Sequence, residues 1–171
     1  MPSQQPPASL ARLFVALWPD AATLERLLAW QRQGCWSPAA RLTQPEHLHL
    51  TLHFIGGVPR DQVPRLAAAL DGPAPSFDLS LSRCEVWRNG AAIVEPDAWP
   101  DALTALHQRL GQALAQQGIA LDARPWRPHV TLARKARGST WPAELPPMPW
   151  RSSGYVLAES QHGYHALRTY R

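Results

Sequence analysis

The sequence predicts an α+β fold of two similar lobes, with a ligand-binding cleft between them. One observation is the order of the expected elements: strand, helix, strand, helix and hairpin in the first half, then helix, strand, loop and hairpin in the second. The other is a motif of histidine, any residue, threonine and leucine, which occurs once in each half, at 49–52 and 129–132. We therefore expect one motif strand in each lobe.

Hydrophobic periodicity and turn residues give the expected elements. Strands are expected at 12–18, 47–54 (with 42–43 leading into it), 77–87, 91–94, 129–132, 155–160 and 164–170, and helices at 21–33, 61–70 and 99–117. Asp20 should cap the first helix and Gly34 should end it. Pro64 is acceptable only in the first turn of the second helix. The proline-rich stretch 138–149 should be a surface loop.

Each motif strand should separate a buried face from a polar face, because strand side chains alternate. The first strand should bury Leu48, Leu50, Leu52 and Phe54 and turn His47, His49, Thr51 and His53 to the other face. In the second, Val130 and Leu132 should point away from Arg127, His129 and Thr131. Each strand thus offers an imidazole and a hydroxyl two residues apart. Two such strands facing each other would form a two-histidine site.

Length and composition favour a single globular unit. With 171 residues, 45% of them hydrophobic, the chain can fill a core. We expect a flexible tail at 1–9, rich in proline and without a basic cluster, and a single bilobal domain at 10–171.

The apolar stretches and the two cysteines both favour a cytoplasmic location for the protein. No stretch has the roughly 18 unbroken apolar residues of a membrane helix, so a cytoplasmic protein, expected to be a monomer, is predicted. Cys35 and Cys84 are expected to be reduced thiols in or near the core. The net charge of +4 is only mild evidence for an anionic partner.

Two phrases in the chain resemble the signature pair of the 2H phosphoesterase superfamily. They are His49-Leu-Thr51-Leu and Arg127-Pro-His129-Val-Thr131-Leu-Ala-Arg134. The opening Arg-Leu-Phe-Val-Ala-Leu and the closing Leu-Ala-Glu-Ser are similar to the bacterial and archaeal branch called 2′-5′ RNA ligase or RNA 2′,3′-cyclic phosphodiesterase. The resemblance covers nearly the whole chain. It implies antiparallel sheets that face a central cleft, with helices on the outside.

The resemblance also implies an activity. This is the hydrolysis of RNA ends that carry a 2′,3′-cyclic phosphate, leaving a 2′-phosphate, without metal or other cofactor and with 2′-5′ ligation as a side or reverse reaction. His49 is implied as the general acid and His129 as the general base. Imidazole suits both roles because it titrates near neutrality. Thr51 and Thr131 can donate hydrogen bonds to the non-bridging phosphate oxygens.

Three further residues complete the candidate site. Arg134 is a natural phosphate clamp, although its parity requires the strand to end or twist just before it. His53 stands where the family is often basic. Phe14 can stack on a base, whereas Trp18 and Trp126 are more often core residues.

Two other classes of function stay open beside the phosphodiesterase. One is a nucleotide-binding or RNA-binding module with little turnover, against which the intact second motif argues. The other is a metallohydrolase built on His47, His49 and His53, although the nearby Glu46 has the opposite parity and such sites need carboxylates. The remaining histidines are expected to be ordinary surface residues: His107, His162 and His165.

Overall fold

A computed structural model describes residues 9–142 and 145–171, so all of the predicted tail except Ser9 lies outside the described residues. The helices are α1 (Ala21–Gln33), α2 (Val63–Ala69) and α3 (Asp101–Gln116), with short 3₁₀ turns at Pro45–His47 and Arg60–Gln62. The strands are β1 (Leu10–Leu17), β2 (Arg41–Leu42), β3 (Leu50–Pro59), β4 (Ser76–Val86), β5 (Ala92–Pro96), β6 (Val130–Arg134), β7 (Met148–Ser153), β8 (Tyr155–Ser160) and β9 (Tyr164–Tyr170). The predicted α+β class is confirmed.

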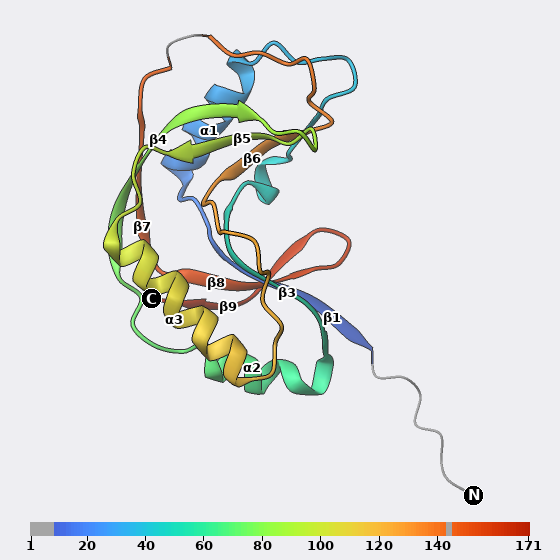
Figure 1. The fold of residues 1–171 in the computed structure, drawn as a ribbon, viewed down its shortest axis with the longest axis vertical. Coiled ribbons are helices and arrows are strands. Elements are labelled where there is room, and N and C mark those ends of the chain that lie inside the picture. The colour runs from blue at the N-terminus through green and yellow to red at the C-terminus, as the bar shows by residue number, and fades with distance from the viewer. Residues whose placement is uncertain (1–8, 143–144) are drawn as a thin grey trace, which may run out of the picture.

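The strands form one curled antiparallel sheet rather than two separate ones. Its order is β7-β4-β5-β6-β3-β1-β8-β9, and β2 pairs with β6 outside this path. The β6 half (β7, β4, β5 and β6) and the β3 half (β3, β1, β8 and β9) are the two lobes (Figure 1). They are joined through the pair Leu50 and Val130. The two motif strands are therefore neighbours at the centre of the sheet.

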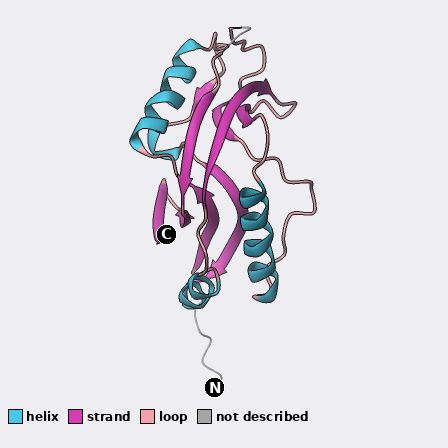
Figure 2. Cartoon of the chain, turned by 90° about the vertical axis from the view of Figure 1, so that its left-hand side faces the viewer, coloured by secondary structure: helices cyan, strands magenta, loops and turns pink. Residues whose placement is uncertain are grey.

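Helices α1 and α3 pack against different parts of the sheet. Gln31 of α1 donates hydrogen bonds to the carbonyl oxygens of Thr43 and of Leu132 in β6, at 2.9 and 2.8 Å. Helix α3 packs against β3 and β4. Figure 2 shows α1 and α3 on opposite sides of the molecule. As predicted, Asp20 caps α1: its Oδ1 accepts from the backbone N–H of Thr23 at 2.7 Å.

One hydrophobic core runs through both halves. It includes inward side chains of β1 and β3 and the leucines at helical spacing in α3: Leu103, Leu106, Leu110 and Leu114. A smaller cluster on the other face of the β3 half contains Phe14, Ala16, Val156 and Ala158. The alternation of β1 therefore divides its side chains between the core and this second face, on which the candidate site lies.

Three predictions about the fold are wrong. The motif strand expected at 47–54 begins only at Leu50 and runs to Pro59, and His47 belongs to the 3₁₀ turn Pro45–His47. Strand β7 includes Pro149, which was assigned to the loop 138–149. Proline is tolerated there because β7 lies at the edge of the sheet, beside β4. Cys35 is exposed rather than near the core, and both Cys35 and Cys84 are free thiols.

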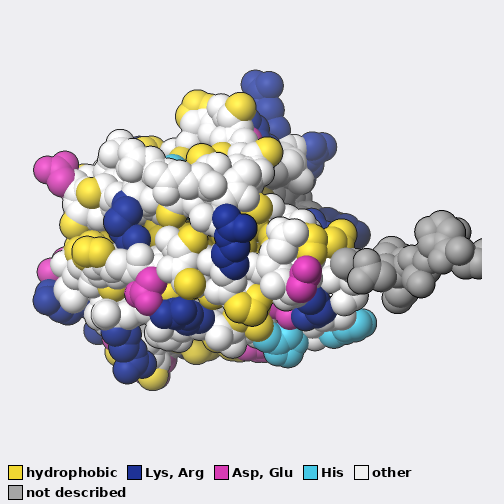
Figure 3. All heavy atoms as spheres, turned by 90° about the horizontal axis from the view of Figure 1, so that it is seen from below, with side chains coloured by type: hydrophobic (Ala, Val, Ile, Leu, Met, Phe, Trp, Pro, Cys, Tyr) yellow, Lys and Arg dark blue, Asp and Glu magenta, His cyan; other side chains and the backbone are white. Residues whose placement is uncertain are grey.

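The face of the molecule seen from below gives no information about partners. Figure 3 shows arginine and lysine side chains spread over the face seen from below rather than gathered in one patch. Within the described residues, no helix is long and apolar enough to cross a membrane. The cytoplasmic location and the monomeric state stay predictions.

Candidate active site

The two motif histidines lie directly before the residue pair that joins the halves. His49 precedes Leu50 and His129 precedes Val130, and these two residues pair in antiparallel register. Continuing that register by one residue puts Thr131 across from His49 and Thr51 across from His129. Diagonal neighbours in such a sheet are about 7 to 8 Å apart. The two histidines are therefore diagonal neighbours across the junction of the two halves.

Both imidazoles are oriented by the same kind of hydrogen bond. Nδ1 of His49 lies 2.7 Å from the carbonyl oxygen of His47, and Nδ1 of His129 lies 2.6 Å from that of Arg127. A carbonyl only accepts, so each Nδ1 carries the proton and each Nε2 is left for the site. Nε2 of His49 accepts from the Thr51 hydroxyl at 3.0 Å. The equivalent bonds, each to the residue two positions earlier, make the histidines a matched pair.

Burial controls the charge of both rings in the free protein. It is the main cause that lowers the pKa of His49 to about 4, and the positive charges of His129, His47 and Arg134 add to it. Burial also lowers the pKa of His129, where the Glu95 carboxylate acts in the opposite direction. Glu95 therefore favours the imidazolium of His129, whereas the charges around His49 disfavour its imidazolium.

An aromatic cluster surrounds His49. Its ring lies 5.4 Å from that of Trp18 in a stacked arrangement, 5.0 Å from Phe14 and 5.2 Å from Tyr164. Phe14 is 3% exposed. It therefore packs against His49 and has no exposed ring face on which a base could stack. Trp18 is half-buried beside His49 and packs against the small cluster of Phe14, Ala16, Val156 and Ala158, as predicted. Sequence analysis missed Tyr164, which reaches the site from β9 because β8 pairs with β1 and β9 pairs with β8.

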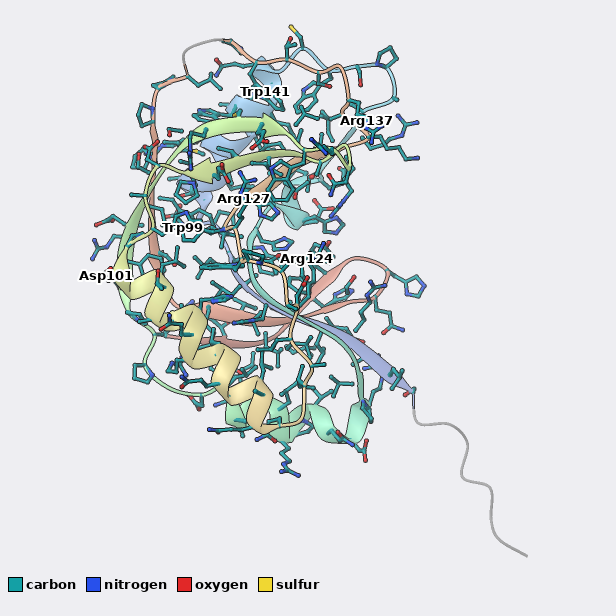
Figure 4. All side chains as sticks on the ribbon, viewed as in Figure 1. Trp99, Asp101, Arg124, Arg127, Arg137 and Trp141 are labelled. Atoms are coloured by element: carbon teal, nitrogen blue, oxygen red, sulfur yellow. The ribbon has the colours of Figure 1, made fainter. Side chains whose placement is uncertain are left out.

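An ion-pair network supports His129. Nη2 of Arg127 lies 2.8 and 2.9 Å from the carboxylate oxygens of Glu95 and 3.1 Å from Glu85. Its guanidinium lies over the ring of Trp87, 5.0 Å from the centroid, and Trp87 lies 4.5 Å from the His129 ring. Figure 4 shows Arg127 between the two halves of the molecule. Arg127 therefore lies beside the site with its charge already partnered.

Arg134 is the last residue of β6 and is exposed. It pairs with Arg41 of β2, and the next residue, Lys135, has a φ of 53°. The strand therefore does not end before Arg134; the irregularity that the clamp role requires is the register shift against β5, where Ala133 pairs with Ala92 and Thr131 with Ile93. Burial is the largest cause that lowers the pKa of both His49 and His129, and the positive charge of Arg134 is a smaller cause that acts in the same direction. Its guanidinium is therefore close to the pair.

The family model described as the 2′-5′ RNA ligase superfamily matches residues 16–148. The chain belongs to this superfamily. The RNA 2′,3′-cyclic phosphodiesterase of Escherichia coli (strain K12) is 31% identical over 151 residues, which are 86% of this chain and 83% of that protein. The protein of the same name from Bacillus subtilis (strain 168) is 29% identical over 134 residues, 74% of this chain and 68% of that one.

Solved structures show the same fold. The crystal structure of E. coli LigT complexed with 3′-AMP has a TM-score of 0.80 and 26% identity, over 94% of this chain and 97% of that one. LigT has also been crystallised with phosphate, again at 94% coverage of this chain, with a TM-score of 0.76.

In this superfamily member, the placement predicted for His53 is wrong. The pairing of β3 with β1 steps from Thr51 opposite Ala16 to His53 opposite Val15, so β3 contains a bulge. The bulge resets the alternation and turns His53 to the face of Val15, toward α3. There Nε2 of His53 donates to the carbonyl of His107 at 2.8 Å. By the same shift, Phe54 is 66% exposed instead of buried.

His107 is not the surface residue that was expected. Its ring is stacked between those of His53, at 4.1 Å, and Trp126, at 3.9 Å. Burial, and then the charge of His53, lower the pKa of His107 to about 4. Trp126 packs against the core, as predicted, and donates from Nε1 to the carbonyl of Thr51 at 3.1 Å. The stack thus fastens α3 and the segment before β6 to the first motif.

The trio His47, His49 and His53 is not assembled, because the bulge separates His53 from the other two. Over the described ranges, no group of three or more histidine, cysteine, aspartate or glutamate side chains could hold a metal ion. His162 and His165 are exposed, as expected.

Proposed function

We propose that this superfamily member hydrolyses RNA 2′,3′-cyclic phosphate ends to a 2′-phosphate, using His49 and His129 as an acid–base pair. The observation that carries the proposal is the matched pair of Nδ1–H to carbonyl hydrogen bonds, which leaves both Nε2 atoms without a proton in the neutral rings, beside the Leu50 and Val130 junction. The names of the E. coli and B. subtilis relatives support the same reaction.

The proton balance of the reaction needs one base and one acid. Nε2 of His129 takes a proton from water while the water oxygen attacks phosphorus. The bond from phosphorus to the ribose 3′ oxygen breaks, and Nε2 of His49 gives that oxygen its proton. Each transfer is worth about 10²- to 10⁴-fold in rate. The order of acid and base follows the family resemblance and stays a prediction.

Substrate binding has to change the charge of His49. The ring is neutral at neutral pH in the free protein, because burial lowers its pKa to about 4. A phosphate anion against Nε2 would favour the imidazolium and raise that pKa. The acid is then charged only when a phosphate is bound.

The remaining polar groups fit phosphate binding. The hydroxyls of Thr51 and Thr131 lie on the histidine face of their strands, and Thr51 would exchange its bond to His49 for one to a non-bridging oxygen. Arg134 adds a positive charge at the end of β6. We leave His53 and Phe14 out of the direct contacts, since His53 faces α3 and Phe14 is buried.

The deciding experiment is incubation of an oligoribonucleotide ending in a 2′,3′-cyclic phosphate with the protein and excess EDTA. We expect turnover to a 2′-phosphate end. Binding without turnover would favour the nucleotide-binding or RNA-binding module. Loss of activity restored by zinc or manganese would favour a metallohydrolase. Adding an RNA with a free 5′ hydroxyl end, which would attack the cyclic phosphate in place of water, tests for 2′-5′ ligation as a side activity.

A further inference from the structure

A strip of five exposed cations runs along the end of the β6 half. We call it the basic strip; its members are Arg41, Arg88, Arg134, Lys135 and Arg137. Over residues 9–142 and 145–171, none of the five forms an ion pair, whereas Arg127 and Arg151 do. Cations that approach each other without carboxylates between them form a site for a polyanion.

The strip is continuous and begins at the active site. Arg134 pairs with Arg41 across β6 and β2, and its charge reaches both catalytic candidates. Beyond Lys135, the backbone N–H of Ala136 donates to the carbonyl of Gly90 at 2.8 Å. The Arg137 guanidinium donates to the carbonyl of Arg88. The turn between β4 and β5 and the end of β6 thus form one surface.

An open cavity of about 480 Å³ lies at the outer part of the strip. It is lined by Val86, Trp87, Arg88, Arg137 and Gly138. Trp87 connects it to the active site, since its ring lies 4.5 Å from that of His129. Figure 4 shows Arg137 at the edge of the molecule, outward of Arg127. The cavity has the size of a small ligand site and combines an aromatic ring with two guanidinium groups.

We propose that the basic strip and this cavity bind the RNA strand that precedes the cyclic phosphate end, with arginines on its phosphodiesters and Trp87 against a base. This inference rests on the proposed function and adds a binding surface, outside the catalytic pair, for the nucleotides that precede the cyclic end. A strand with a cyclic end continues from the 5′ side of its last nucleotide, so its further phosphates need cations outside the catalytic pair. Guanidinium groups bind phosphate in a bidentate manner, and aromatic rings stack on any base. The protein should therefore prefer an oligonucleotide to a cyclic mononucleotide.

The test compares kcat/KM for a cyclic-phosphate-ended pentaribonucleotide with kcat/KM for a 2′,3′-cyclic mononucleotide. In the double variant Arg88→Ala/Arg137→Ala, the ratio of the two values should fall about 10-fold or more. The matched control is Arg32→Ala/Arg65→Ala, which removes the same charge from exposed positions on α1 and α2. In the control the ratio should stay within about two-fold. An unchanged ratio in the strip variant overturns the proposal.

Binding separates this inference from the proposed function. Fluorescence anisotropy with a labelled pentaribonucleotide that ends in a 2′-phosphate requires no turnover. The slope of log K against log salt should decrease in magnitude by about 1.4 in the strip variant, at about 0.7 for each lost contact to single-stranded RNA. A protein that binds RNA in this way but turns nothing over would overturn only the proposed function.

The single variant Arg88→Ala tests the proposal without changing a hydrogen bond made by a side chain of the fold. The guanidinium of Arg88 makes no hydrogen bond within the described part of the chain, so Arg88→Ala removes no bond of the fold. It should reduce the salt slope by about half as much as the double variant. A slope equal to that of the wild-type protein would contradict the proposal.

Discussion

Glu95 holds Arg127 through two hydrogen bonds from Nη2, of 2.8 and 2.9 Å, and the Glu95 side chain is only 5% exposed. The backbone carbonyl of the same arginine accepts the Nδ1–H of His129. Glu95 thus acts on His129 in two ways. It fixes the residue that orients the ring, and its negative charge favours the imidazolium.

Replacing Glu95 by glutamine should lower the pKa of His129. The amide keeps hydrogen-bonding capacity but loses the charge that opposes the effect of burial, while Arg127 and Arg134 still disfavour the imidazolium. NMR titration of the His129 ring measures the change directly. The matched control is Glu159→Gln, which removes a similarly buried carboxylate from β8, where it is bound to Arg60. A His129 pKa equal to that of the wild-type protein would mean that Glu95 acts only on structure.

The same variant tests the order of acid and base. If His129 is the base, the acid limb of the bell-shaped kcat/KM profile should move to lower pH in Glu95→Gln. If His129 is the acid, the alkaline limb should move instead. Because neighbouring imidazoles titrate as a coupled pair, the profile is compared with the NMR titration rather than assigned alone.

Removing either histidine should cost most of the turnover. We expect His49→Ala and His129→Ala each to lower kcat by about 10²- to 10⁴-fold. The double variant should cost far less than the product of the two losses, because acid and base act as a unit. Single-turnover kinetics on a cyclic-phosphate-ended oligonucleotide measure both. His165→Ala, an exposed histidine outside the pair, is the control. Near-normal turnover in His129→Ala would show that the second motif has another purpose.

Sequence patterns predicted the regular parts of the site well. In β6, Val130 and Leu132 are fully buried, and Thr131 between them is on the other face. The first motif follows the same rule as far as Thr51. It fails at His53 because a bulge adds one residue to β3 relative to β1, and the sequence between Thr51 and Phe54 contains no glycine or proline that marks it.

The neighbours of the histidines could not be predicted, because they come from distant parts of the chain. Tyr164 touches His49 only because β8 pairs with β1 and β9 with β8. Helical spacing predicted the buried leucines of α3. It did not predict that His107 is stacked between two rings, because one of them, Trp126, belongs to the segment before β6. Such contacts depend on strand order, which a local pattern does not contain.

Shortening Trp18 should raise the pKa of His49. Burial is the largest cause of its low value, and the Trp18 ring covers one face of the imidazole. Trp18→Leu lets water reach that face, so the charged form becomes less unfavourable and the pKa moves from about 4 toward its ordinary value. NMR titration of His49 gives the shift. Trp99→Leu, which changes an exposed tryptophan that stacks on Trp126, is the control. An equal shift in both variants would contradict this account.

His107 should make the protein less stable in mild acid. Its pKa is 6.5 as an ordinary histidine and about 4 in the fold, where burial and then the charge of His53 disfavour the imidazolium. Between these values the unfolded chain binds a proton that the folded chain does not. Protons therefore favour unfolding, and the stability present above pH 6.5 is lost as the pH falls toward 4.

His107→Phe isolates this contribution. Phenylalanine keeps a ring between His53 and Trp126 and removes the titrating group, and the bond from His53 is kept because it goes to the backbone carbonyl of residue 107. We expect the free energy of unfolding, measured by urea titration, to fall less between about pH 7 and pH 4.5 in the variant than in the wild-type protein. The control His165→Phe changes an exposed histidine and should keep the wild-type pH dependence. If His107→Phe loses as much stability over this interval as the control, the other buried histidines carry the acid sensitivity, and the stack serves only to fasten α3 to the first motif.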